Sequence, residues 1–208
     1  MSVTSNQVRS FASYQVNRLL SLPDGAQKAA LANLRRGLGH APGELPELWG
    51  EFLLTMPEEM LSRTGEPTRA EWAVYTALTM FALHQQGRDP RTESVNRSGQ
   101  TLGLAARQLV HDEKEDRPRV ARRFNAFATA ADAAELAHHL RGLVQLFKAE
   151  GIALDYPLLA SDLFRYLTPS QTDQVRLSWG QDFYSSRKNV ENNANEREEN
   201  SHEQPVVS

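Results

Sequence analysis

The sequence predicts an all-α protein, because helical periodicity with clear start and stop signals recurs along most of its 208 residues. Alternating runs of β-branched residues, which are typical of strands, are very few. We count about nine helices with short connectors and expect two packed helical-bundle halves. The polar, turn-rich stretch 87–100 predicts a loop between an N-terminal half, 1–95, and a C-terminal half, 96–188.

Composition excludes several classes of protein. No run approaches the roughly 20 apolar residues of a membrane helix, and the N-terminus carries no readable secretory signal. The chain has no cysteine, which excludes disulfides and thiolate metal sites. We therefore expect a cytoplasmic protein.

The segment PDGAQKAALANLRRGLG predicts a helix that begins at Asp24. The Asp24 side chain can accept orphan N–H groups as an N-cap, and strong helix formers follow it. Gly37 suits the left-handed position at a helix end. Arg35 and Arg36 stand in the last turn, where cations favour the helix dipole, so a structural role is sufficient to explain this pair.

The segment TRAEWAVYTALTMFALHQQG predicts a central, buried helix. Thr68 and Glu71 form a capping box, and residues 72–83 are apolar nearly all round. Gly87 ends the helix. His84 follows the apolar run and is typical of a hydrogen-bonded histidine at the end of a buried helix.

The stretch RPRVARRF, residues 117–124, gathers four arginines in a chain whose formal net charge is −3. On a helical wheel Arg119, Arg122 and Arg123 share one face. Another face carries an apolar stripe that can anchor the helix: Val120, Phe124 and Phe127.

Two interpretations of these arginines are open. They can form a solvated face whose partners are the acids that precede the helix, Asp112, Glu113, Glu115 and Asp116, which also suit the helix N-terminus. A solvated face more usually interleaves acids at i+4, however, and here all the acids come first. The alternative is a face that binds phosphate.

Two further helices are predicted toward the C-terminus. The segment DAAELAHHLRGLVQLFKAEG begins at Asp132 and ends at Gly151. The segment TPSQTDQVRLSWGQDFY has Thr168 as its N-cap, Pro169 at its first position and Gln171 reaching back to the cap.

The last twenty residues, 189–208, hold five acids and one arginine, a net charge of −4, and have almost nothing to bury. This composition predicts a disordered acidic tail. Residues 1–188 carry 22 basic and 21 acidic side chains, so the folded part is nearly neutral. We therefore expect tight nucleic-acid binding to depend on an assembled complex.

No motif for catalysis is present. Glu135 and His138 form an E-x-x-H pair of the kind that binds di-iron in helix bundles, but no second pair follows. Gly37 and Gly39 lack the third glycine and the preceding strand of a nucleotide-binding loop. We find no G-x-S-x-G, H-E-x-x-H or Walker motif, and we predict no enzymatic activity, metal or cofactor.

The tryptophans do not form an obvious stacking platform. Each stands three or four residues before another aromatic residue, a spacing typical of core pairs: Trp49 and Phe52, Trp72 and Tyr75, Trp179 and Phe183. Any nucleic-acid contact is therefore expected from arginine and lysine to the backbone, which makes it salt-sensitive and indifferent to sequence.

Five blocks of the sequence, in order, resemble the CasB family, the small subunit of the type I-E CRISPR complex Cascade. The blocks are LRRGLGHAPGELPELW, YTALTMFALHQ, GQTLGLAARQL, RRFNAFATAADAAELAHHLRGLVQLFKAEGIALDYPLLASDL and VRLSWGQDFY. They span nearly all of residues 26–184. Each block alone is a weak helical pattern, but their joint order and spacing make the match specific.

The resemblance implies an all-α, noncatalytic subunit present in two copies along a complex built on a guide RNA. Its basic side chains would contact the path of guide RNA and target DNA and steady the displaced strand of the R-loop. At matched positions the resemblance implies phosphate contacts by Arg35, Arg36, Arg122, Arg123 and Arg141. Secondary candidates, supported by local chemistry and neighbouring blocks, are Arg107, Arg119, Lys148 and Arg165.

Two other classes of function are compatible with these residues. In a protein-binding helical adaptor the same arginines would meet acidic surfaces of a partner. A helical metal oxidoreductase would need iron or manganese in stoichiometric amount.

Overall fold

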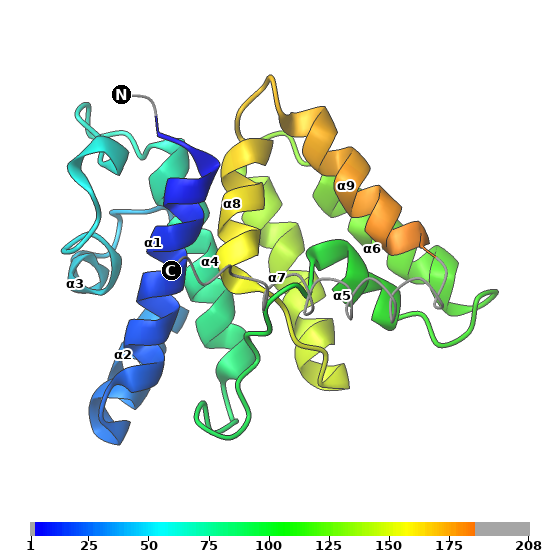
Figure 1. The fold of residues 1–208 in the computed structure, drawn as a ribbon, viewed down its shortest axis with the longest axis horizontal. Helices are drawn as coiled ribbons and strands as arrows, with labels where there is room; N and C mark the ends of the chain where they lie inside the picture. Colours follow the sequence, from blue (N-terminus) through cyan, green and yellow to red (C-terminus); the bar gives the residue numbers. More distant parts are fainter. Residues whose placement is uncertain (1–2, 186–208) are drawn as a thin grey trace, which may run out of the picture.

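The computed structural model describes residues 3–185 (Figure 1). This part of the chain folds into nine α-helices and two short 3-10 helices. In chain order they are α1 (Ser5–Ser21), α2 (Asp24–Arg36), η1 (Pro46–Leu48), α3 (Trp49–Phe52), η2 (Glu58–Met60), α4 (Arg69–Gln85), α5 (Leu102–Gln108), α6 (Asp116–Ala128), α7 (Ala133–Glu150), α8 (Tyr156–Tyr166) and α9 (Thr172–Tyr184). Within the described range there is no strand, only an isolated bridge between Asn96 and Leu154. The all-α prediction is confirmed.

Helix α4 lies at the centre of the molecule. The capping box of Thr68 and Glu71 starts it, as predicted, and residues 73–85 are all buried. Helices α1, α2, α7 and α8 pack around it. Figure 1 shows α1 and α2 on one side of α4 and α7 on the other.

The two predicted halves meet along a continuous core. Helix α1 packs along α8, and α4 packs against both α7 and α8. Buried side chains from both sides of residue 95 belong to one hydrophobic cluster. The division at 95–96 stays a prediction, and the predicted tail, 189–208, lies outside the described residues.

Helix α9 closes the C-terminal side by packing against α5 and α8. The predicted apolar stripe of α6 is buried, and its rings contact those of α9. The ring centroids of Phe124 and Phe183 are 4.9 Å apart, and those of Phe127 and Trp179 are 4.8 Å apart. These contacts fix which face of α6 points outward.

The N-terminus of α2 differs from the prediction. Asp24 is the first helical residue and not the N-cap, which is Pro23 and makes no side-chain capping bond. The Asp24 carboxylate instead pairs with the ammonium group of Lys28, one turn later, at 2.9 Å. An i,i+4 ion pair on the exposed face replaces the predicted cap.

The C-terminus of α2 also differs from the prediction. Gly37 has φ −68°, which is right-handed, so the predicted left-handed conformation was wrong. Glycine is needed for space, because a Cβ there would lie 2.5 Å from the Tyr75 hydroxyl and 2.8 Å from Leu48 Cδ1. The Tyr75 hydroxyl donates a hydrogen bond to the Gly37 carbonyl oxygen at 2.9 Å. This contact ties the end of α2 to α4.

The start of α9 lies four residues later than Thr168. The Thr168 hydroxyl donates to the Phe164 carbonyl at 2.9 Å, so it serves the end of α8 and does not cap α9. Helix α9 begins at Thr172, and Gln171 makes no side-chain capping bond. The predicted capping role of Thr168, with Pro169 and Gln171 helical, was therefore wrong.

The other predicted helix ends are confirmed. Asp132 accepts a hydrogen bond from the Glu135 amide at 2.8 Å at the start of α7. Gly151, with φ 68°, and Gly87, with φ 87°, take the left-handed conformation after α7 and α4. Stretch 87–100 is a loop, anchored where Gln85 Oε1 accepts from the Val95 amide at 3.0 Å.

None of the helices in residues 3–185 has the length and hydropathy needed to cross a membrane.

Replacing Gly37 by alanine tests the contact between α2 and α4. We expect Gly37→Ala to lower the free energy of unfolding by roughly 1–3 kcal/mol, because the new methyl group overpacks against Tyr75 and Leu48. Gly25→Ala is the matched control, since it makes the same change in α2 where no atom lies within 4 Å of the added Cβ. Urea unfolding measures both variants. Equal stability of Gly37→Ala and the wild type would contradict the tight contact.

Asp162 makes stability depend on pH. Its carboxylate accepts the indole N–H of Trp179 at 3.0 Å, and burial raises its pKa to about 6. This pKa lies above that of Asp162 in the unfolded chain, so protonation of Asp162 stabilises the fold. The stabilisation is fully present below about pH 4 and is lost as pH rises through 6. Asp162→Asn removes the charge and keeps an acceptor for Trp179.

We therefore expect Asp162→Asn to gain stability over the wild type as pH rises. The gain should be about 2 kcal/mol larger at pH 7.5 than at pH 4.5. Urea unfolding of both proteins at the two pH values measures this difference, and other titrating groups cancel in it. A gain that does not change with pH would show that Asp162 titrates normally.

Candidate nucleic-acid interface

The arginine face of α6 is exposed, as predicted. Arg119, Arg122 and Arg123 point away from the buried stripe of the helix. Arg119 is bound to Asp116 one turn earlier. Arg122 and Arg123 form no ion pair with any side chain in the described range 3–185.

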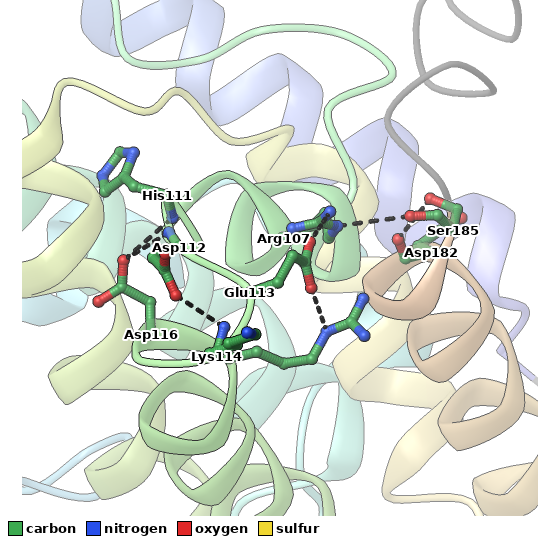
Figure 2. Close-up of polar contacts among 9 residues, drawn as sticks. Arg107, His111, Asp112, Glu113, Lys114, Asp116, Asp182 and Ser185 are labelled. Atoms are coloured by element: carbon green, nitrogen blue, oxygen red, sulfur yellow. Dashed lines mark hydrogen bonds and ion pairs between the residues drawn. The ribbon is translucent and has the colours of Figure 1, made fainter.

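Two acids at the start of α6, Asp112 and Asp116, bind the backbone of their own turn (Figure 2). Asp112 Oδ1 accepts from the amides of Lys114 and Glu115 at 2.7 and 2.8 Å. Asp116 Oδ2 accepts from the amides of Asp112 and His111 at 3.0 and 3.1 Å, and the Asp112 bond is the main cause of its lowered pKa. These carboxylates shape the turn and the start of α6.

Glu113 pairs with two other arginines and not with Arg122 or Arg123, which we call the α6 pair. It bridges Arg107 on α5 and Arg117 on α6, whose Nε lies 2.9 Å from Glu113 Oε2. Arg107 also donates to the Ser185 carbonyl at 3.4 Å, and its side chain is only 12% exposed (Figure 2). The acids thus engage Arg107, Arg117 and Arg119.

A second group of cations gathers where α2, the loop after α4, and α7 meet. We call Arg35, Arg88 and Lys148 the basic cluster. Arg88 Nη2 donates to the Lys148 carbonyl at 3.0 Å, and Lys148 Nζ donates to Gln86 Oε1 at 3.1 Å. Burial lowers the pKa of Lys148, and the charges of Arg35 and Arg88 lower it further. No member of the basic cluster forms an ion pair within residues 3–185.

Two cations of the basic cluster act electrostatically on His84. This histidine is fully buried at the end of α4, and its Nδ1 lies 2.8 Å from the Tyr156 hydroxyl, which confirms the predicted hydrogen-bonded role. Burial lowers its pKa to about 4, and the charges of Arg88 and Lys148 add to this shift. His84 therefore stays neutral beside the cations.

A cleft of about 390 Å³ opens beside Arg35 and Arg88. It also contains Lys28, but its acids Asp24 and Asp89 are engaged. Asp24 pairs with Lys28, and Asp89 Oδ1 accepts from the Arg91 amide at 2.9 Å.

A second hollow, which we call the α7 cleft, has a volume of about 410 Å³ and contains the exposed Arg141. It lies between the segment that leaves α2, the side of α4 that carries Trp72 and Thr76, and the first half of α7. Its lining residues are Gly37, Leu38, Gly39, His40, Ala41, Glu44, Trp72, Tyr75, Thr76, Thr79, Met80, Ala134, Ala137, His138 and Arg141. Burial raises the pKa of Tyr75 to about 12, with a further contribution from the charge of Glu44.

The predicted residues thus fall into separate groups. Arg35 and Lys148 come together, with Arg36 next to Arg35 and Arg141 on the same helix as Lys148. Arg122 and Arg123 stand on α6, and α2 and α6 lie on opposite sides of α4 and α7 in Figure 1. Arg165 is on α8, partly buried and 3.7 Å from Asp162.

Sequence reasoning missed Arg88 and two of the aromatic residues. Arg88 stands in a polar loop, and only the approach of α4 to α7 gives it a role. The core assignment was wrong for Trp49, which is 49% exposed, and incomplete for Trp72, which is partly exposed and lines the α7 cleft. Trp179 is buried, as predicted.

Removing one cation from the basic cluster tests whether it is under electrostatic strain. We expect Lys148→Met to raise the unfolding temperature at low salt, because the unbranched stem remains while repulsion from Arg35 and Arg88 is lost. At 1 M salt the gain should shrink, since the screening length falls to about 3 Å. Lys28→Met, which removes a paired lysine, should give no such gain. If Lys148→Met does not raise the unfolding temperature at low salt, repulsion within the basic cluster does not destabilise the fold.

Comparisons with known proteins agree in family and fold. A family model described as CRISPR-associated protein Cse2 matches residues 30–184. The structure is similar to the crystal structure of CasB from Thermobifida fusca, with 31% identity, a TM-score of 0.69, and coverage of 86% of this chain and 98% of that chain. It also has the fold of M. ruber CasB, with 21% identity, a TM-score of 0.62, and coverage of 88% and 97%. The comparison with curated sequences gave no match.

Proposed function

The chain belongs to the CRISPR-associated Cse2 family, a family of noncatalytic Cascade subunits that includes CasB, and from this we propose a nucleic-acid-contacting role for it. In this role it contacts the guide RNA, the target DNA and the displaced strand through basic residues, and so stabilises the R-loop. Its other proposed partners are neighbouring Cascade subunits and a second copy of itself.

One observation carries the proposal. Arg122 and Arg123 are exposed on a helix that is anchored by its other face, while Asp112, Glu113 and Asp116 bind backbone amides or other arginines. An arginine pair with no internal partner among the described residues is free to bind phosphate oxygens, for which guanidinium geometry is well suited.

The other principal residues share this property. Arg35, Arg36 and Arg141 have no ion pair within residues 3–185, and Arg36 and Arg141 are exposed. Among the secondary residues, Lys148 also forms no ion pair within residues 3–185. Arg107, Arg119 and Arg165 already bind carboxylates, so their contribution to phosphate binding should be smaller.

The energetics of R-loop formation favour such a surface. Strand exchange replaces one duplex by another of nearly equal stability, so a few backbone contacts decide whether the open state persists. The folded part is nearly neutral, with 22 basic and 21 acidic side chains in residues 1–188. Local groups of free cations, and not net charge, would supply the attraction once the complex is assembled.

Contacts with other subunits have their own supporting observation. Several large apolar side chains are exposed, and they stand on α1, α3 and its following turn, and α9: Tyr14, Trp49, Leu54, Leu177 and Tyr184. Leu54 is 82% exposed, which makes it the strongest candidate for burial against a partner protein.

The proposal predicts a change in salt dependence when the α6 pair is removed. We expect Arg122→Ala/Arg123→Ala, in reconstituted Cascade, to weaken target binding and to reduce the slope of log K against log[salt] by about 1.4–1.8. Arg63→Glu is the control, because it makes the same charge change at a side chain 81% exposed and outside both clefts.

Incorporation of the subunit is measured in parallel. Normal incorporation with an unchanged salt slope would refute phosphate binding by this pair. Loss of incorporation would assign the arginines to an acidic protein partner, as in an adaptor.

A further inference from the structure

The α7 cleft has the form of a small-ligand site. Its volume of about 410 Å³ falls in the usual range for such sites. Its lining combines apolar side chains such as Leu38 and Met80 with polar side chains such as Thr79. Apolar surface combined with a few placed polar groups is typical of a site for a small organic ligand.

An aromatic ring is available inside the cleft. Trp72 stands in the first turn of α4 and is partly exposed, although α4 is otherwise buried. No described residue binds its indole N–H. The Trp72 ring can therefore stack on a base, and its N–H can donate to one.

The rim carries the charge that a phosphate needs. His138 and Arg141 are exposed and stand three residues apart on α7, so both belong to the same edge. The facing segment holds His40 and the one carboxylate of the described lining, Glu44. Glu44 Oε2 lies 2.9 Å from His40 Nδ1, so this carboxylate has a local partner.

Cations continue from the cleft along α7. Lys148 follows Arg141 by seven residues, which puts it on the same face about 10 Å further along the helix. There Lys148 joins Arg35 and Arg88 in the basic cluster. A stacking ring followed by a row of cations matches a nucleic-acid strand better than it matches an acidic peptide, which has no need for the ring.

We propose that the α7 cleft binds one unstacked nucleotide of a single strand, with its base against Trp72 and its phosphates on Arg141 and the basic cluster. This inference rests on the proposed function and deepens it, because it assigns base contact to a subunit whose α6 arginines would contact only phosphate. A nucleotide bound in this way would pair with cations that have no ion-pair partner within residues 3–185, namely Arg141 and Lys148 of α7 and Arg35 of α2.

Photocrosslinking in reconstituted, target-bound Cascade tests what occupies the cleft. The exposed cleft residue Ala134 is replaced by p-benzoylphenylalanine, and the crosslinked product is treated with nuclease or protease. We expect a product that carries labelled nucleic acid and is nuclease-sensitive. A product that contains another protein subunit, or no product, would overturn the inference.

A matched pair of tryptophan variants tests the stack itself. Trp72→Leu should shorten the R-loop lifetime by roughly five-fold or more, the effect of losing one base–aromatic stack. Trp72→Phe keeps an aromatic ring at the same position and should retain most of the wild-type lifetime. Circular dichroism checks that both variants fold. Equal lifetimes for the two variants would also overturn the inference.

These results separate the cleft from the proposed function. If the cleft is empty while removal of Arg122 and Arg123 still lowers the salt slope, the nucleotide pocket is wrong and phosphate contact by α6 stands. If neither experiment detects nucleic acid, both are wrong.

Discussion

Residues 73–85 of helix α4 are all buried, so the helix forms only where the rest of the chain packs around it. This requirement sets the positions of α1, α2, α7 and α8, which come from both ends of the sequence. At its ends, Glu71 is bound in the capping box and His84 Nδ1 lies within hydrogen-bond distance of the Tyr156 hydroxyl. Covering α4 also brings the end of α2 close to α7, and this approach creates the basic cluster and the α7 cleft.

The distribution of acids decides which arginines are available. The carboxylates of Asp112, Glu113 and Asp116 bind amides and three neighbouring arginines. Arg122 and Arg123 have no ion-pair partner in the described part of the chain. A protein of nearly balanced charge can in this way keep two adjacent arginines without a carboxylate partner, as the proposed role requires. Weak attraction suits an R-loop, because the exchange of strands is itself nearly balanced.

The sequence was sufficient for features that depend on neighbours along the chain. The capping box of Thr68, the left-handed Gly151 and the two faces of α6 follow from spacing and residue type. Features that depend on distant contacts were not predictable. The sequence predicts a left-handed Gly37, whereas glycine is needed there to leave room for the Tyr75 hydroxyl, which is 38 residues away in the chain. The sequence likewise predicts an N-cap at Thr168, whereas its hydroxyl binds a carbonyl of the preceding helix.

The same limit applies to the candidate site. The arginine pairs were visible as local clusters, whereas Arg88 acquires its role only through α7.

The most direct measurement is the structure of reconstituted Cascade with a bound target, in which the guanidinium groups of Arg122 and Arg123 are located. We predict a phosphate oxygen about 3 Å from each guanidinium. A protein carboxylate in that place would contradict nucleic-acid contact by α6.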